Sequence, residues 1–304
     1  MTMNSSGPIS LAGTTAGVSI EIENGGNGTT MISLNDTAVR NLAGVPSGAI
    51  TMPTNFYGKS NRVAIAITIS ANTANYTLNT AKATGYVAGK SDITLTINSG
   101  VIVSSASTGS YAFVVDTSWA AGDTITIVNN GTILGKGGNG GIGATNSVGA
   151  GAGTSAGPAL NVQRATSINN VNRIAGGGGG GGGGAKGFAI HGKNQDDWGG
   201  GGGGGGIGIG SAGAGGTIGM GFGGSAGTAG TLTANGNGGF GGSSAYGAGG
   251  SGGTGGTYGT SGVNGMNASQ NTSTPGNGGA AGAAVVGNTN ITWIAVGTRN
   301  GSIS

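Results

Sequence analysis

Hydrophobic and polar residues alternate in several short runs between residues 59 and 134. The apolar positions of these runs are Val63, Ile65, Ile67, Ile69, Ile93, Leu95, Ile97, Tyr111, Phe113, Val115, Ile125 and Ile127. A period of two predicts half-buried β-strands, and the Asn, Gly, Ser and Asp residues between the runs predict turns. We therefore expect a small β-sandwich or β-roll over residues 59–134. Residues 72–84 break the alternation and predict a helix or a long loop.

Residues 1–58 have a different pattern. Val18, Ile20 and Ile22 alternate with polar residues, which predicts a half-buried strand. Further on, Asp36 precedes an apolar pair spaced for one helical face, and Gly44 follows it, which predicts a short helix with a cap at each end. This stretch is too short to bury a large core by itself, so we expect it to dock onto another surface.

From Gly135 onward, glycine recurs at every third position. The registers are 210 to 219, 221 to 230, 236 to 242, 247 to 265 and 276 to 282, each in steps of three. Three residues per turn is the period of the polyproline II helix, which rises about 3.1 Å per residue and has no internal hydrogen bonds. Glycine on one edge of such a helix lets a neighbour approach closely, so that main-chain groups pair between helices. We therefore expect a bundle of polyglycine II helices in residues 135–304.

Two uninterrupted glycine runs, Gly176–Gly184 and Gly199–Gly206, flank the varied insert 185–198. At about 3.1 Å per residue the runs span roughly 28 Å and 25 Å. Matched lengths around an insert predict an antiparallel pair of rods with the insert as a loop at one end. Ordering glycine backbone is entropically unfavourable, so a single rod is not expected to be stable outside a bundle.

An internal echo links the two halves of the chain. The segment TIVNNGTILGKGG (126–138) resembles TSINNVNRIAGGGG (166–179) at an offset of 40 residues. Each has an Asn pair and an apolar, strand-like lead into glycine, which indicates two entries from β structure into the glycine region. Near the end of the chain, Ile291, Trp293 and Ala295 predict a closing strand against the β unit or the bundle.

Composition excludes several classes of protein. The chain has 304 residues, of which 77 are Gly and only 5 are Pro, so a collagen-like triple helix is excluded. The formal charge of +3 rests on few, dispersed charged residues, so we expect no nucleic-acid partner. No apolar stretch approaches the roughly 20 residues of a membrane-spanning helix, and we expect no membrane insertion and no secretory signal peptide. There is no cysteine for a disulfide framework.

The candidate catalytic motifs are weak, and we expect neither enzymatic activity nor a cofactor. Gly58-Lys59-Ser60 and Gly89-Lys90-Ser91 resemble the end of a phosphate-binding loop, but the glycine required five positions earlier is absent from both. The only histidine, His191, has two carboxylates nearby in sequence, Asp196 and Asp197. These three side chains could hold a metal, although their spacing matches no known loop; the alternative is a solvated polar loop.

Recognition of a partner is the better interpretation of insert 185–198. Its candidate contact residues are Phe188, His191, Lys193, Asp196, Asp197 and Trp198. Aromatic side chains of this kind are enriched at binding hot spots, and the charges supply selectivity. The alternative is that Trp198 covers the ends of the adjacent rods. Further inserts are 231–237, 243–246 and 263–275.

Other apolar residues of the glycine region allow two interpretations. Tyr246 and Tyr258 are candidate contact residues, or they pack on the faces of the bundle. Packing between layers is expected for Ile207, Ile209, Ile218, Met220, Phe222 and Phe240.

Two resemblances connect these patterns to bacteriophages. The segments SSGPISLAGTTAGVSIEIE (5–23), ISLNDTAVRNLAGVPSGAI (32–50) and FYGKSN (56–61) resemble a leader found on phage tail and baseplate proteins, where it attaches the protein to the virion. VNNGTILGKGGNGG (128–141), the glycine runs and VVGNTNITWIAVGTRNG (285–301) resemble the receptor-recognising adhesins at the long-tail-fibre tip of T-even-type phages. In that family, polyglycine II helices carry loops that bind outer-membrane proteins.

These resemblances imply a mostly β and irregular fold of three parts. The parts are a virion-attachment unit (1–58), a β-rich domain (59–134) and a polyglycine II domain with recognition loops (135–304). The implied partners are a phage tail or fibre protein, bound through residues 1–134, and a bacterial outer-membrane protein or surface glycan. The alternatives are a structural tail-tip or baseplate protein that touches no receptor, and an ice-binding or surface-coating protein built from similar rods.

Overall fold

The computed structural model describes residues 2–191, 194–219, 221–270 and 273–304, and the fold is mostly β with few helices. The chain forms two compact units. Unit 1 contains Met1–Ile65, Thr84–Asp92 and Ala120–Asp123, and unit 2 contains Ala66–Ala83, Ile93–Trp119 and Thr124–Ser304. The chain therefore leaves unit 1 and returns to it twice before the glycine region begins.

Unit 1 holds the short helices α1 (Ile20–Glu23), α2 (Thr37–Ala43) and η1 (Thr54–Phe56) around a small core of its own. The core residues are Met3, Ile20, Val39, Leu42, Ala43 and Phe56. The strand expected at residues 18–22 is wrong, because the Ser19 hydroxyl accepts a hydrogen bond from the Ile22 N–H (3.3 Å) and starts a single helical turn instead. Over so few residues, alternation does not separate a strand from one turn of helix.

The helix expected after Asp36 is confirmed as α2. It ends at Gly44, whose φ of 72° is the left-handed conformation that glycine adopts most easily. Val39 and Leu42 are buried on one face, as their spacing predicts. The Asp36 carboxylate does not cap the helix, however, because it accepts from the N–H of Ser33 (2.7 Å) in the preceding turn.

The β part of the chain is wound as successive coils, each of which adds one strand to each of three sheets, except that the last coil adds a strand to only two of them. The first three coils contain β1 (Val63–Ile69), β2 (Thr73–Ala74), β3 (Tyr76–Leu78), β4 (Ser91–Ile97), β5 (Ile102–Ser104), β6 (Phe113–Val115), β7 (Thr124–Asn129), β8 (Thr132–Leu134) and β9 (Leu160–Val162). The last two contain β10 (Thr166–Asn170), β11 (Arg173–Ala175), β16 (Val285–Val286), β17 (Ile291–Ala295) and β18 (Thr298–Asn300). The turns η2 (Thr80–Lys82) and η3 (Asn288–Asn290) join strands.

Three sheets result, with the orders β1-β4-β7-β10-β17, β2-β5-β8-β11-β18 and β3-β6-β9-β16. Strands of successive coils pair in parallel, as Ile168 does with Ile127 and Phe113 with Leu160. The expected β-sandwich is therefore wrong: the alternation located the strands, but it does not say whether a strand pairs with its sequence neighbour or with the next coil. Residues 72–84, expected as a helix or loop, contain β2, β3 and η2.

The internal echo corresponds to two successive coils. Thr132 lies opposite Arg173 and Asn129 opposite Asn170, one residue away from the offset seen in the sequence. The two asparagines are fully buried, and the Asn129 Nδ2 donates to the Asn170 Oδ1 at 2.8 Å. The expected closing strand is confirmed, because β17 pairs in parallel with β10.

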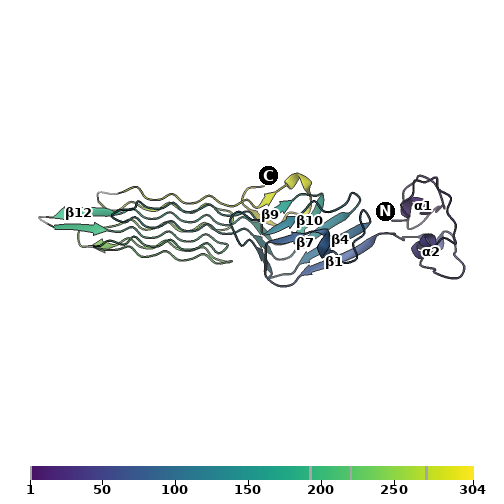
Figure 1. The fold of residues 1–304 in the computed structure, drawn as a ribbon, viewed down its shortest axis with the longest axis horizontal. Coiled ribbons are helices and arrows are strands. Elements are labelled where there is room, and N and C mark those ends of the chain that lie inside the picture. Colours follow the sequence, from purple (N-terminus) through teal and green to yellow (C-terminus); the bar gives the residue numbers. More distant parts are fainter. Residues whose placement is uncertain (1, 192–193, 220, 271–272) are drawn as a thin grey trace. The chain divides into compact units, whose positions relative to one another are not determined.

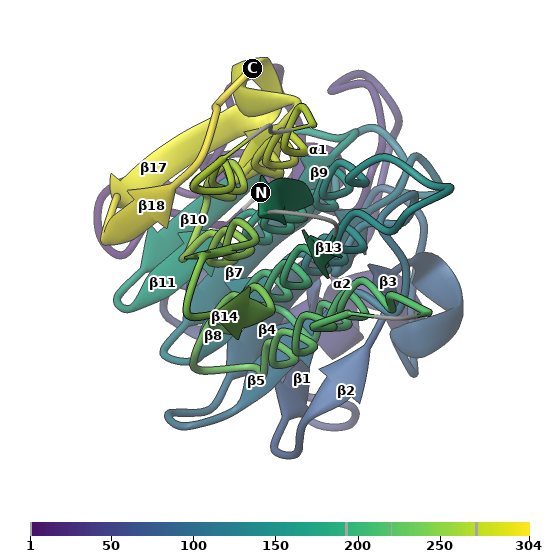
Figure 2. The same ribbon diagram turned by 90° about the vertical axis from the view of Figure 1, so that its left-hand side faces the viewer.

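Ten extended, glycine-rich segments interrupt the coils in the described part of the chain. They are residues 135–144, 149–157, 176–184, 199–206, 210–216, 224–230, 236–242, 249–256, 260–266 and 276–282. Two lie between β8 and β9, and eight lie between β11 and β16. Both insertions therefore follow a strand of the same sheet, because β8 and β11 are neighbours in the sheet that also contains β2, β5 and β18. The segments run side by side in Figure 1 and are seen end-on in Figure 2.

The run 176–184 is enclosed by other segments on all sides. Its N–H groups donate in rotation to segments 149–157, 199–206 and 260–266, and its carbonyls accept in rotation from segments 135–144, 249–256 and 276–282. For example, the Gly181 N–H donates to the Gly204 carbonyl at 2.8 Å. Three consecutive residues thus face three directions, as a threefold extended chain requires.

The run 199–206 is enclosed in the same way. It donates to segments 135–144, 224–230 and 249–256, and it accepts from segments 176–184, 210–216 and 236–242. The two runs are antiparallel neighbours, as their matched lengths predict, because Gly184 donates to Gly201 and Gly181 to Gly204.

Enclosure explains why only these two runs are pure glycine. A Cβ added at Gly181 would lie 2.0 Å from the carbonyl oxygen of Gly253, and one at Gly203 would lie 2.0 Å from that of Gly181. A Cβ at Gly149, in contrast, would meet nothing within 4 Å. Peripheral segments need glycine only where they face a neighbour, which gives the period of three.

The close approach leaves no room for large side chains between segments, so the expected interlayer packing is largely wrong. The residues that are exposed instead are Ile209, Phe222 and Phe240, at 46%, 44% and 78%. Ile207 is buried as expected, and Ile218 is half-buried. Met220 lies outside the described residues.

Candidate functional site

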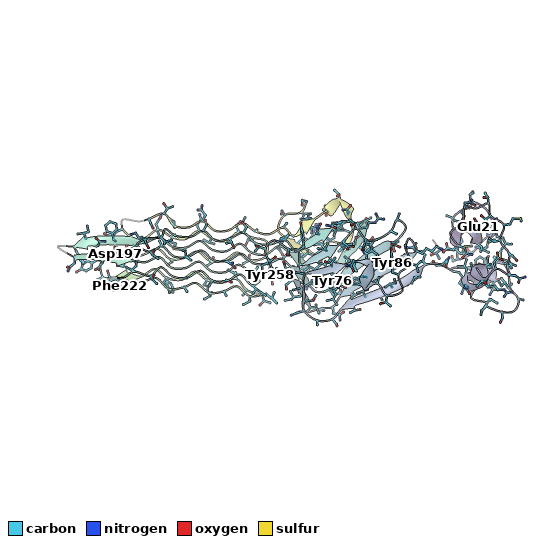
Figure 3. All side chains as sticks on the ribbon, viewed as in Figure 1. Glu21, Tyr76, Tyr86, Asp197, Phe222 and Tyr258 are labelled. Atoms are coloured by element: carbon cyan, nitrogen blue, oxygen red, sulfur yellow. The ribbon has the colours of Figure 1, made fainter. Side chains whose placement is uncertain are left out.

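The connections between glycine segments lie at two opposite ends of the set of segments in unit 2. One end, called here the distal end, carries the connections 145–148, 185–198, 217–223, 243–248 and 267–275. The opposite end, beside the β coils, carries 207–209, 231–235 and 257–259. Figure 3 labels Asp197 and Phe222 at the distal end and Tyr258 at the other. The longest and most varied connections therefore lie together, away from the coils.

Insert 185–198 forms a β-hairpin at the distal end. Strand β12 (Gly187–His191) pairs antiparallel with β13 (Asn194–Trp198), with Phe188 opposite Asp197 and His191 opposite Asn194. The candidate residue Lys193 lies outside the described residues. The exposed fraction of Ile190, next to this tip, is 69%.

Trp198 is fully buried beneath a second, shorter hairpin, β14 (Ser243–Ser244) with β15 (Gly247–Ala248). Its indole Nε1 donates to the Ser244 hydroxyl at 3.0 Å. A Cβ at Gly247 would lie 2.6 Å from the indole ring, so that glycine lets the backbone cover the ring. This position matches the alternative in which Trp198 covers the ends of the rods, and the ring itself is not on the surface.

The Ser244 hydroxyl joins the two hairpins. It accepts from Trp198 and from the N–H of Tyr246 (3.2 Å), and it donates to the Asp196 carboxylate at 2.8 Å. A hydroxyl has one proton to donate and two lone pairs to accept, so all of its hydrogen-bonding capacity is used.

The side chains of His191 and Tyr246 are in contact across the two hairpins. Their ring centroids are 3.8 Å apart at an interplanar angle of 61°, an edge-on contact. The His191 Nε2 is 3.8 Å from the Asp196 Oδ1, within ion-pairing distance when the histidine is protonated. Tyr246 is 54% exposed. The structure thus brings His191, Asp196 and Tyr246 together from two separate connections.

Two further connections are tied to the hairpins. The Gln270 Nε2 donates to the Tyr246 carbonyl at 2.9 Å, which links connection 267–275 to the second hairpin. The Phe222 N–H donates to the Asp197 carbonyl at 2.9 Å, which links connection 217–223 to the first. The distal end is therefore a network in which backbone and side-chain hydrogen bonds fix the exposed residues.

Tyr258 is not part of this cluster. Its ring lies under the Arg173 guanidinium, 4.1 Å from the ring centroid, and its hydroxyl donates to the Leu232 carbonyl at 3.4 Å. Both partners belong to the end beside the coils, where insert 231–237 also begins. Patterns in the sequence did not identify Ser244 or Phe222 as residues of the site, although counting the segments as alternately outward and returning assigns each connection to its end.

The chemistry of the distal end is that of contact. Among the described residues, no group of three or more His, Cys, Asp or Glu side chains could hold a metal ion. A search of the described residues likewise found no helix with the length and apolar character of a membrane span. What the distal end offers is exposed aromatic and aliphatic surface beside two carboxylates, the mixture found at binding surfaces.

Comparison with known proteins identifies the family. The crystal structure of the gp37-gp38 adhesin tip complex of the bacteriophage S16 long tail fiber is similar at 23% identity and a TM-score of 0.49, covering 93% of this chain and 96% of that one. No curated protein matches. The sequence model of the phage tail fibre adhesin Gp38 family matches residues 64–304. The chain therefore belongs to the Gp38 family of phage tail fibre adhesins.

Proposed function

We propose that this adhesin binds a receptor on the bacterial surface through its distal end. As a member of the family, it is a virion protein of the tail-fibre tip. The observation that carries the proposal is the gathering of five connections at one end of the segments, with Ile190, Phe222 and Tyr246 exposed there. The receptor is an outer-membrane protein or a surface glycan, and it is bound without chemical change.

The glycine segments, in this proposal, are a bundle of polyglycine II helices whose role is to hold the distal end rigidly away from the coils. The rotation of hydrogen bonds among three neighbours supports this conformation. Two of the helices are enclosed by the other eight. Each helix is therefore hydrogen-bonded to several neighbours, and the bundle can support loops of different sequence without changing its own structure.

Residues 1–134 are proposed to attach the adhesin to a phage tail or fibre protein. In this division, 1–58 is the attachment unit, 59–134 the β-rich domain and 135–304 the domain that presents the loops. Two observations support a separate role for the first part: unit 1 has its own buried core, and the family match begins only at residue 64.

Binding of the purified, labelled protein to host cells tests the proposal. We expect saturable binding that competes with adsorption of the phage and that is lost on host mutants lacking one outer-membrane protein or the lipopolysaccharide. Equal binding to all such mutants and to unrelated bacteria would count against receptor recognition and favour the structural alternative.

A further inference from the structure

We propose that the hairpins 187–198 and 243–248 act as one recognition unit and that Ser244 is the positioning residue that couples them. This inference rests on the proposed function. It adds that residues of two connections, which several glycine segments separate in the sequence, recognise the receptor jointly. Ser244 is half-buried and takes part through its partners.

The coupling follows from the three hydrogen bonds of the Ser244 hydroxyl. Trp198 and Asp196 are at the base of the first hairpin, whereas the Tyr246 N–H belongs to the second. One hydroxyl therefore fixes the position of β13 and the direction of the turn that carries the Tyr246 ring. Loss of the hydroxyl leaves the indole N–H and the carboxylate without their shared partner, which disfavours the observed arrangement.

In this proposal, the hydrogen bonds of Ser244 hold the rings of His191 and Tyr246 in contact. The ring centroids are 3.8 Å apart across the hairpins, and the Asp196 Oδ1 is 3.8 Å from the His191 Nε2. Tyr246 is exposed, so its ring offers contact area whose orientation depends on His191. Replacing either ring changes the surface offered by the other, and their contributions to receptor binding are not independent.

A double-mutant cycle on receptor binding tests the inference. The probe is whole cells of the strain that the phage infects, and the variants are His191→Ala, Tyr246→Ala and the double variant. We expect about a tenfold loss of affinity from each single change and a similar tenfold loss from the double variant. Independent residues would give about a hundredfold loss, since independent free energies add.

Repeating the cycle in a Ser244→Ala background tests the positioning role. We expect Ser244→Ala alone to weaken binding about tenfold, from the loss of hydrogen bonds, and to abolish the coupling between the rings. Ser244→Thr keeps the hydroxyl and should restore both. Ser105→Ala is the matched control, because the Ser105 hydroxyl donates to the carbonyls of Ser107 and Ser110 in the coils, far from the distal end.

The outcomes separate the two proposals. If the unaltered protein does not bind the host cells, the proposed function and this inference both fall. The inference falls and the proposed function stands if the unaltered protein binds but the losses of affinity from the two ring substitutions multiply in the double variant. The same holds if Ser244→Ala binds as the unaltered protein does. If Ser105→Ala matches Ser244→Ala in both unfolding temperature and lost binding, general destabilisation explains the effect, and the positioning role is overturned.

Discussion

Replacing one enclosed glycine tests whether the two uninterrupted runs are the interior of the glycine region. In Gly181→Ala, the new methyl group would lie 2.0 Å from the Gly253 oxygen, whereas ordinary contact begins at 3.4 Å. The difference, 3.4 − 2.0, requires the segment 249–256 to move by about 1.4 Å, because the atoms it meets are backbone. The methyl group has no flexible neighbour that could make room for it.

The loss of stability in Gly181→Ala can be worked out from the hydrogen bonds that join segment 249–256 to the run that contains Gly181. The bonds are Gly250 N to Ala185 O (2.8 Å), Gly253 N to Gly182 O (2.8 Å) and Gly256 N to Gly179 O (2.7 Å). A shift of this size stretches them beyond hydrogen-bonding distance, and at about 1 kcal/mol each their loss destabilises the fold by about 3 kcal/mol. The reduced entropy of the unfolded chain offsets up to about 1 kcal/mol of this.

Gly149→Ala is the matched control and should change stability in the opposite direction. Its methyl group meets nothing within 4 Å, and the backbone is not left-handed there. We therefore expect it to stabilise the protein by roughly 0.4–1 kcal/mol through the unfolded state. Denaturant unfolding of the full chain, followed by circular dichroism, measures both. Equal stability of the two variants would refute the enclosure of segment 176–184.

Three further outcomes are expected. Asn170→Ala removes the bond that its Oδ1 accepts from the Asn129 Nδ2 (2.8 Å) and the bond that its Nδ2 donates to the Val296 carbonyl (2.7 Å), so denaturant unfolding should show a loss of about 1–3 kcal/mol; an unchanged midpoint would contradict this. Tyr246→Ala should reduce binding to host cells about tenfold while Tyr258→Ala leaves it unchanged, and the reverse order would count against recognition at the distal end. Burial raises the pKa of Tyr76, so the folded state favours the protonated phenol. Its contribution to the free energy of unfolding should be full below about pH 10 and fall as the pH rises through the raised pKa. Tyr76→Phe should reduce this fall, and the same dependence of stability on pH in the variant would contradict the role of Tyr76.

How far the sequence predicts this fold depends on the range of each interaction. The glycine period predicts the extended segments because the threefold repeat is set within each segment, whichever neighbouring backbone lies beside the glycine. The alternation around Ile93 and Ile127 predicts strands for the same reason, since both faces of a strand are set by residues two apart. The parallel coils were not predictable in this way, because the partners of a strand lie far away in the chain: Ile168 pairs with Ile127, 41 residues before it, and with Trp293, 125 residues after it.

The candidate site shows the same division. An irregular insert between two glycine runs predicts a loop at residues 185–198, and the structure has this insert at the end of the rod pair, as a hairpin that the sequence did not predict. The sequence could not predict that Trp198 is buried, because the backbone that covers it comes from Gly247, past four further glycine segments. Counting the segments does place Tyr258, because it is separated from Tyr246 by one segment and therefore lies at the opposite end.

Recognition at the distal end can be tested most directly by blocking one end at a time. The chain has no cysteine, so a single introduced cysteine can carry a bulky polymer at a chosen place. Ser147→Cys places it in an exposed distal connection, and Thr233→Cys places it in an exposed connection at the opposite end. We predict that the polymer at 147 lowers binding to host cells at least tenfold and that the polymer at 233 leaves binding unchanged. Unchanged binding with the distal polymer, or a greater loss with the polymer at 233, would contradict receptor recognition at the distal end.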